Sequence, residues 1–141
     1  MKIRGAKRED LKEIAEIMME ESAKEPYNEK YTLRIAVKEV GEFFEDELYV
    51  AIEDGKIIGF VASGVTSEND KRVYVNELWV GSDYQKRGIG KALLGFVEKI
   101  YREKGFRKIR LTVRRDAEAF KFYKKMKYEE YKKLVYMEKK L

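Results

Sequence analysis

The sequence predicts one α+β domain over residues 1–141, a mixed α/β sandwich in which about four helices flank a central, mostly antiparallel sheet. Its length of 141 residues fits a single domain with its own core. Segments with helical and strand-like periodicity alternate along the chain, and Asp54-Gly55 between two apolar runs is typical of a β-hairpin. The order predicts two helices after the first strand, then an antiparallel meander, then strand–helix–strand–helix–strand.

The first half of the chain supplies one short strand and two helices. Residues 1–5 form the strand, and residues 8–22 form a helix whose apolar residues recur at spacings of three and four. Pro26 interrupts that helix because proline disfavours helical conformation in the residue before it. A second amphipathic helix is expected at residues 32–44.

The second half begins with the hairpin and contains the remaining elements. Strands are expected at residues 48–52 and 56–65, and the turn at residues 67–70 leads into a strand at 72–80. A helix follows at residues 88–104, where Gly105 ends it. The last three elements are a strand at 108–113, a helix at 117–126 and a final strand near residues 134–138.

Composition limits the chemistry that the chain can perform. It contains no cysteine and no histidine, so a disulfide, a thiolate intermediate and a protein-bound zinc ion are not expected. No apolar run is long enough to span a membrane, and the first residues lack the apolar region of a signal peptide, so a cytoplasmic, metal-free protein is expected. The formal net charge of +5 is modest, since acids and bases are interspersed.

The stretch from Leu78 to Leu94 is the most informative part of the sequence. An apolar strand ends, a glycine-containing basic turn follows, and an amphipathic helix begins at once. The amides of a helix's first turn have no intrahelical partner and lie at the positive end of its dipole, which favours an anion. The predicted phosphate contacts come from backbone amides and side chains of Gln85, Lys86, Arg87, Gly88, Ile89, Gly90 and Lys91.

Two common phosphate-binding loops do not fit this turn. A P-loop requires a longer spacing between its glycines and a hydroxyl residue after the lysine, where this chain has Ala92. A dinucleotide-binding fingerprint requires a small residue where this chain has Leu93.

The pattern Gln85-x-x-Gly88-x-Gly90 after Leu-Trp-Val resembles motif A of the GNAT acetyltransferase superfamily, in which the loop holds the pyrophosphate of acetyl-CoA. Downstream, a strand-like segment and then Asp116-x-x-Ala119-x-x-Phe122-Tyr123 look like the family's Asn-x-x-Ala-x-x-Phe-Tyr signature. The resemblance covers nearly the whole chain. It implies a sheet splayed between the fourth and fifth strands, where the backbone of Leu78, Trp79 and Val80 pairs with the pantetheine arm.

The chain departs from the family pattern at two positions. Asp116 replaces the usual Asn; it is expected to cap the following helix but lacks the amide donor that often touches the pantetheine. Lys127 stands where many members have glycine.

The resemblance implies direct transfer of an acetyl group from acetyl-CoA to a primary amine in a ternary complex. Tyr123 matches the tyrosine that often protonates the sulfur of coenzyme A, although periodicity alone favours a core residue at this position. Glu77 is the candidate general base, with an exposed glutamate as the alternative and Asn76 or Tyr74 as other candidates. Glu77 and Trp79 face away from Leu78 and Val80 unless a bulge intervenes. The amide of Trp79 or Val80 would polarise the thioester carbonyl.

The acceptor is a small-molecule or peptide amine of unidentified structure, expected near the first two helices. Acids and aromatics in that region could attract a cation, although a solvated loop is the plainer interpretation: Glu20, Glu21, Glu25, Tyr27, Asn28, Glu29 and Tyr31. A noncatalytic acyl-CoA sensor on the same fold is the alternative function. Nucleic acid is not an expected partner, because acids interrupt the C-terminal lysines. A homodimer is left open, since dimers are common in the family.

Overall fold

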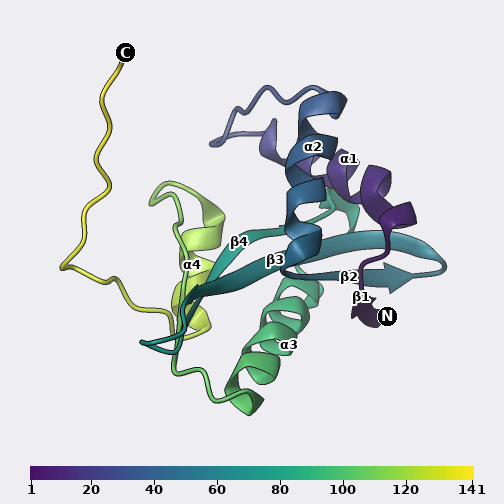
Figure 1. The fold of residues 1–141 in the computed structure, drawn as a ribbon. Coiled ribbons are helices and arrows are strands. Elements are labelled where there is room, and N and C mark those ends of the chain that lie inside the picture. The colour runs from purple at the N-terminus through teal and green to yellow at the C-terminus, as the bar shows by residue number, and fades with distance from the viewer.

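The apolar periodicity of the sequence places most helices and strands where they are observed. The structure is a computed structural model that describes residues 1–141 (Figure 1). Its elements are β1 (Lys2–Gly5), η1 (Arg8–Asp10), α1 (Leu11–Ser22), α2 (Leu33–Glu42), η2 (Phe43–Glu45), β2 (Glu47–Glu53), β3 (Lys56–Ser67), β4 (Arg72–Val80), η3 (Ser82–Tyr84), α3 (Ile89–Glu103), β5 (Lys108–Arg110) and α4 (Glu118–Lys125). The short 3-10 turn η1 forms the first residues of the helix predicted at 8–22, and η2 forms the last residues of the helix predicted at 32–44.

The five strands pair in chain order, and only the last pair is parallel. The predicted hairpin joins β2 to β3, with Glu53 opposite Lys56. Asp54 and Gly55 both adopt positive φ angles, 51° and 74°, as a two-residue turn between twisted strands requires. The parallel pair β4–β5 needs a crossover, which α3 provides.

The sheet separates two apolar cores. α1 and α2 lie on one face and α3 on the other (Figure 1). The α1–α2 core is built from buried residues of both helices and of β2 and β3, among them Ile14, Met18, Val40, Val50 and Phe60. The α3 core includes Ile58, Val61, Val73, Leu93, Leu94 and Val97, with the α4 residues Phe122 and Tyr123 packed against it.

A β-bulge interrupts the pairing of β3 with β4. Ala62 lies opposite Glu77 and Ser63 lies opposite Val75, so Asn76 between them has no partner on β3. An extra residue of this kind shifts the alternation of side chains between the two faces of a strand.

The bulge changes which residues of β4 face which core. Before it, Val75 faces the α3 core; after it, Leu78 and Val80 do. Trp79 packs against the α1–α2 core instead. Glu77 hydrogen-bonds Trp79 and lies on that same side, opposite Leu78 and Val80 as the sequence predicts.

The sheet opens between its fourth and fifth strands. β5 pairs with β4 only where residues 108–110 lie beside residues 72–74, whereas β4 continues to Val80. Residues 75–80 therefore have no strand neighbour on that side. This is the splay that the sequence resemblance implies, although β5 is shorter than the expected strand 108–113.

The predicted final strand at residues 134–138 is wrong. Residues 132–141 contain no helix or strand, and the chain runs away from the body of the molecule (Figure 1). The apolar run in this segment has no neighbouring strand in its own chain, so no ladder of backbone hydrogen bonds can form.

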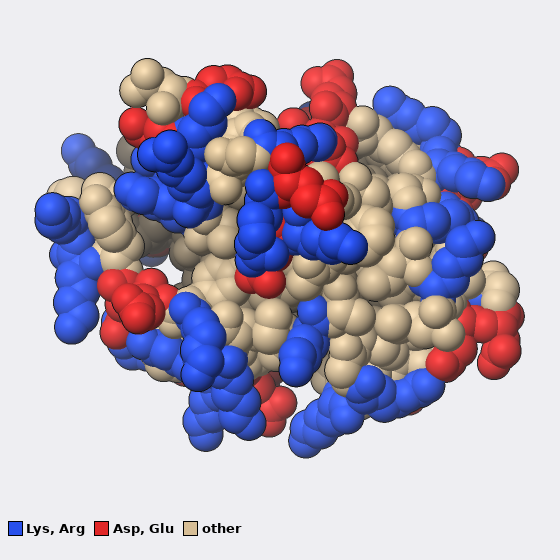
Figure 2. All heavy atoms as spheres, turned by 90° about the horizontal axis from the view of Figure 1, so that it is seen from below, with Lys and Arg blue, Asp and Glu red and all other residues tan.

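The surface is densely charged, with both signs mixed. On the face seen in Figure 2, lysine and arginine side chains are interspersed with acidic ones rather than gathered in one continuous patch. None of the helices combines the length and the apolar character needed to cross a lipid bilayer.

One buried hydrogen bond joins α3 to the sheet and provides a test of this packing. The hydroxyls of Ser63 and Tyr101 lie 2.9 Å apart and are both buried. Tyr101→Phe leaves the Ser63 hydroxyl without its partner, so we expect it to lower the free energy of unfolding by about 1–2 kcal/mol. Adding Ser63→Ala removes the unpaired hydroxyl and should recover part of the loss. Urea denaturation measures both changes, and an unchanged stability in Tyr101→Phe would contradict the assignment.

Candidate functional site

The turn between β4 and α3 presents free backbone amides at one point. Gly88 is the residue before the helix and has a φ of 82°, a left-handed conformation that favours glycine. Lys86 also has a positive φ, 62°. No side chain caps the start of α3, so the amides of its first turn are available to a ligand. The space where a side chain would project from Gly88 is open, which suits an anion approaching the backbone.

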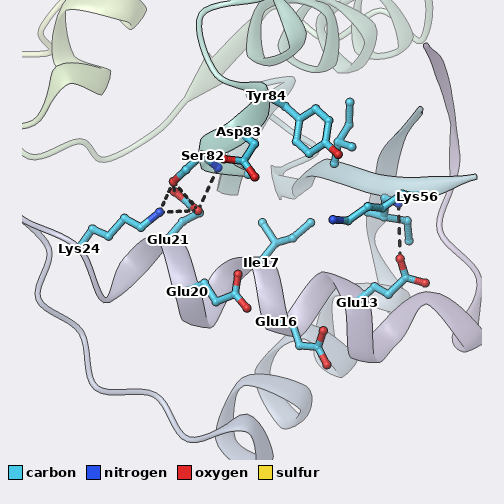
Figure 3. Close-up of a pocket in the computed structure, with 13 residues that line it drawn as sticks. Glu13, Glu16, Ile17, Glu20, Glu21, Lys24, Lys56, Ser82, Asp83 and Tyr84 are labelled. Carbon is cyan, nitrogen blue, oxygen red and sulfur yellow. Dashed lines mark hydrogen bonds and ion pairs between the residues drawn. The ribbon is translucent and has the colours of Figure 1, made fainter. Parts of the chain in front are cut away.

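A buried carboxylate on α1 fixes the start of this turn. Glu21 accepts hydrogen bonds from the Ser82 amide at 3.1 Å, from the Ser82 hydroxyl at 2.8 Å and from the Gln85 side-chain amide at 3.1 Å. Lys24 forms an ion pair with it at 2.9 Å (Figure 3). The turn is therefore attached to α1 as well as to the sheet, an interaction that the sequence did not reveal.

These contacts divide the predicted phosphate ligands into two groups. The Gln85 amide donates to Glu21 and to the Val80 carbonyl at 2.8 Å, so it braces the turn. Arg87 forms an ion pair with Glu53 at 2.7 Å. Lys86 and Lys91 are exposed and form no ion pair, which leaves them available to an anion.

A hollow of about 360 Å³ lies on the α1 side of the turn (Figure 3). Five carboxylates and two lysines line it: Glu13, Glu16, Glu20, Glu21, Asp83, Lys24 and Lys56. This excess of negative charge repels a diphosphate. An anion therefore fits the amides at the start of α3 and not this hollow.

Beyond the turn, the second half of β4 has backbone groups that face the gap. Gly81 donates its amide to the Ile58 carbonyl at 2.8 Å, which makes Gly59 and Val80 a pair without mutual hydrogen bonds. The N–H and C=O of Val80 then point away from β3, toward the open side. Leu78, two residues earlier, has the same orientation, so the amide facing the gap is that of Val80 rather than Trp79.

Glu77 lies part-buried between the gap and the α1–α2 side. Burial raises its pKa to about 7; the Trp79 indole N–H, 2.6 Å from its carboxylate, opposes this, and the charges of Glu39 and Glu29 add to it. A carboxyl group with this pKa exchanges protons readily near neutral pH. Glu39 is a charged neighbour of Glu77 that helical periodicity gave no reason to single out.

Tyr123, on α4, packs at the border of the α3 core. Burial raises the pKa of its phenol, and the charges of Tyr27 and Glu77 raise it further. The phenol therefore remains protonated at neutral pH and can donate a proton. The structure thus brings together Glu77 and Tyr123, which are 46 residues apart in the sequence.

Aromatic side chains surround Glu77 on the α1–α2 side. The Tyr27 ring contacts the Trp79 ring edge-on with centroids 5.0 Å apart. Burial raises the pKa of Tyr31, and the negative charges of Glu39, Glu77 and Glu29 raise it further. Tyr27, Glu29 and Tyr31 from the predicted acceptor region therefore lie near the candidate base. Glu20 and Glu21 instead line the acidic hollow.

Three other sequence-based candidates have different environments from those expected. Asp116 does not cap α4: the residue before the helix is Ala117, and the Asp116 carboxylate pairs with Arg114 at 2.9 Å, which lowers its pKa. Asn76 is exposed at the bulge. The Tyr74 hydroxyl hydrogen-bonds Thr112 where the pairing of β4 with β5 ends.

The raised pKa of Glu77 has a consequence for stability. Below about pH 4.5 the carboxyl is protonated in both the folded and the unfolded chain; between pH 4.5 and about 7 only the folded chain keeps the proton, so stability falls as pH rises. Above pH 7 the carboxylate is charged in both the folded and the unfolded chain, so the free energy of unfolding stays lowered by the full cost of burying that charge.

We therefore expect Glu77→Gln to raise the free energy of unfolding by about 1–3 kcal/mol relative to the wild type at pH 8.5, and to leave it unchanged at pH 4. Urea denaturation at the two pH values measures both differences. Exposed Glu68→Gln is the matched control. Equal stability of Glu77→Gln and wild type at both pH values would show that the carboxyl is not desolvated.

Comparison with known proteins gives a consistent result. The acetyltransferase (GNAT) family profile matches residues 10–128. An uncharacterised N-acetyltransferase of Methanocaldococcus jannaschii is 30% identical over 136 residues, which is 91% of this chain, but the chain spans only 60% of that relative's length.

Two solved structures show the same fold. A possible acetyltransferase of Clostridium difficile superimposes with a TM-score of 0.84 at 18% identity, over 99% of this chain and 97% of that one. The PaiA N-acetyltransferase of Thermoplasma acidophilum, solved in complex with coenzyme A, has a TM-score of 0.73 at 27% identity, over 89% of this chain and 87% of that one. The bulged, splayed sheet and the family match lead to one conclusion: this chain belongs to the GNAT acetyltransferase family.

Proposed function

We propose that this acetyltransferase moves an acetyl group directly from acetyl-CoA to a primary amine bound at the same time. The observation that carries the proposal is that Glu77, a carboxyl group whose pKa is about 7, lies close enough to the buried phenol of Tyr123 for its charge to raise the pKa of that phenol, which stays protonated. The chain lacks cysteine, so a route through an acetyl-cysteine intermediate is not open to it.

The start of α3 supplies a fitting site for the diphosphate of acetyl-CoA. The free first-turn amides, the open approach at Gly88 and the unpaired Lys86 and Lys91 all favour an anion. The coenzyme A complex of the Thermoplasma relative supports this choice of ligand. The backbone of Leu78 and Val80 would hold the pantetheine arm as an added strand does, by main-chain hydrogen bonds.

The proposed chemistry uses two proton transfers. Glu77 takes a proton from the ammonium group of the acceptor, whose usual pKa of about 10.4 leaves little free amine at pH 7. The amine nitrogen then attacks the thioester carbon, a C–N bond forms and the C–S bond breaks. Tyr123 protonates the departing sulfur and recovers the proton that the new amide nitrogen gives up, so Glu77 finally releases one proton to water.

The Val80 amide is suited to stabilise the charge that develops on the carbonyl oxygen. It faces the gap without a partner on β3, and a fixed N–H donor needs no reorganisation during the reaction. The aromatic and acidic residues around Glu77 favour a cationic acceptor on the α1–α2 side.

A first prediction concerns the phosphate site. Gly88→Ala disfavours the left-handed conformation by about 1–2 kcal/mol, so the free turn shifts away from it and binding must restore it, and the new methyl group fills the open approach to the amides; we therefore expect the Kd for coenzyme A to rise about tenfold or more. Gly95→Ala, at an uncrowded position within the same helix, is the matched control and should leave the Kd unchanged. Calorimetry measures both values. Wild-type affinity in Gly88→Ala, or no binding by the wild type, would contradict the site.

A second prediction concerns turnover. With a panel of primary amines and release of free thiol as the readout, we expect Glu77→Gln and Tyr123→Phe each to lower kcat about 10²–10⁴-fold. In the wild type, kcat/KM should rise with pH through a midpoint near 7, and Glu77→Gln should lack this limb.

The same panel separates the enzyme from the alternative of a noncatalytic acyl-CoA sensor. Coenzyme A binding without turnover of any amine would favour the sensor. Wild-type turnover in Tyr123→Phe would remove the role of the phenol.

A further inference from the structure

The Glu77 carboxylate is held by a side chain of its own strand. The indole N–H of Trp79 donates to Oε2 of Glu77 at 2.6 Å. Residues two apart on a strand share one face, so the bulge at Asn76 places both side chains on the α1–α2 side of the sheet. A hydrogen bond to a charged acceptor is shorter and stronger than one between neutral groups. The bond from Trp79 therefore gives the Glu77 side chain one preferred orientation.

The other oxygen of this carboxylate is left open. The bond from Trp79 is the only hydrogen bond that the Glu77 side chain forms within the protein. No buried side-chain oxygen or nitrogen in the structure lacks a hydrogen-bond partner, so Oε1 of Glu77 is accessible to solvent or to a bound molecule. One oxygen is held and the other is free, which suits a carboxylate that accepts a proton from a substrate.

The indole is held in turn from outside the sheet. The ring of Tyr27, in the loop between α1 and α2, contacts the Trp79 ring with centroids 5.0 Å apart and an angle of 75° between the ring planes. Aromatic pairs prefer such an edge-to-face arrangement. Trp79 also packs against the α1–α2 core. The orientation of Glu77 therefore depends on a series of contacts that begins in this loop.

The charged groups around Glu77 make the indole donor important. The negative charges of Glu39 on α2 and Glu29 in the α1–α2 loop raise the pKa of Glu77, in the same direction as burial. Three phenols, from the same loop and from α4, lie near enough for the charge of Glu77 to raise their pKa values: Tyr27, Tyr31 and Tyr123. Among the groups that shift the pKa of Glu77, only the Trp79 indole stabilises the charged form.

We propose that Trp79 is a positioning residue for the reaction: its side chain, held by Tyr27, fixes the Glu77 carboxylate and leaves Oε1 for the acceptor. This role rests on the proposed function, in which Glu77 takes the proton of the acceptor amine. Trp79 acts through Glu77 and needs no contact with the reacting atoms. Without its N–H, the carboxylate is free to rotate and its charged form loses its one donor.

Trp79→Phe tests this role because it keeps an aromatic ring and removes the N–H donor. We expect kcat at the high-pH plateau to fall about tenfold, since the carboxylate is no longer oriented. The midpoint of the rise of kcat/KM with pH should move up by about one pH unit, because the charged carboxylate loses a stabilising donor. The Kd for coenzyme A should stay unchanged, because the substitution keeps the main chain of β4. Tyr49→Phe, which removes a hydrogen bond to the carboxylate of Glu47 on β2, is the matched control and should keep the wild-type pH profile.

Tryptophan fluorescence tests the contact without any turnover, because Trp79 is the only tryptophan of the chain. In the wild type, the emission should change with pH through a midpoint near 7, as the hydrogen-bonded carboxyl group ionises. In Glu77→Gln it should stay constant over the same pH range. Tyr27→Ala should shift the emission to longer wavelength, since more water reaches the indole, and Tyr27→Phe, which keeps the ring, should retain the wild-type emission.

Three results would overturn the positioning role: a wild-type midpoint in the pH profile of Trp79→Phe, a constant emission in the wild type, or a pH-dependent emission that persists in Glu77→Gln. The fluorescence titration uses the wild-type chain, so it decides the contact even if Trp79→Phe does not fold. Failure of the proposed function gives a different pattern. No turnover of any amine, together with an emission that titrates through Glu77, would overturn that function and support the contact between Trp79 and Glu77.

Discussion

The site depends on one irregularity in the central sheet, the β-bulge at Asn76. Without it, the alternation that starts at Val75 would direct Glu77 into the α3 core and remove Leu78 and Val80 from it. With it, apolar side chains cover α3 while the Glu77 carboxylate lies on the α1–α2 side. The same strand then continues past the end of its pairing with β5, which leaves the Val80 amide facing the gap.

The second requirement is a turn that is held firmly while its amides stay free. Glu21, on α1, holds the turn: it accepts hydrogen bonds from Ser82 and Gln85 and does not occupy the amides at the start of α3. A buried carboxylate is costly unless several donors satisfy it, and here backbone, hydroxyl, amide and ammonium groups do so. The network links α1 to the proposed cofactor loop.

Sequence alone predicted much of this molecule because its signals were local. Helical spacing located α1, α2 and α3, the Asp54-Gly55 pair located the hairpin, and the glycine pattern located the turn at Gly88. The roles of Gln85 and Arg87 as braces could not be predicted, because their partners Glu21 and Glu53 are distant in sequence. Strand propensity predicted a strand at residues 134–138, but a strand also needs a neighbour, and propensity does not identify one.

The proposed mechanism requires that the fold hold Glu77 in a desolvated position, where its carboxyl group can act as a base near neutral pH. The most direct measurement is a carbon-13 NMR titration of the side-chain carboxyl groups, with Glu77→Gln used to assign the signal. We expect a midpoint of about pH 7 for Glu77. A midpoint near 4.5, the value of an unperturbed glutamate, would show that the carboxyl group is not desolvated and would rule out this role.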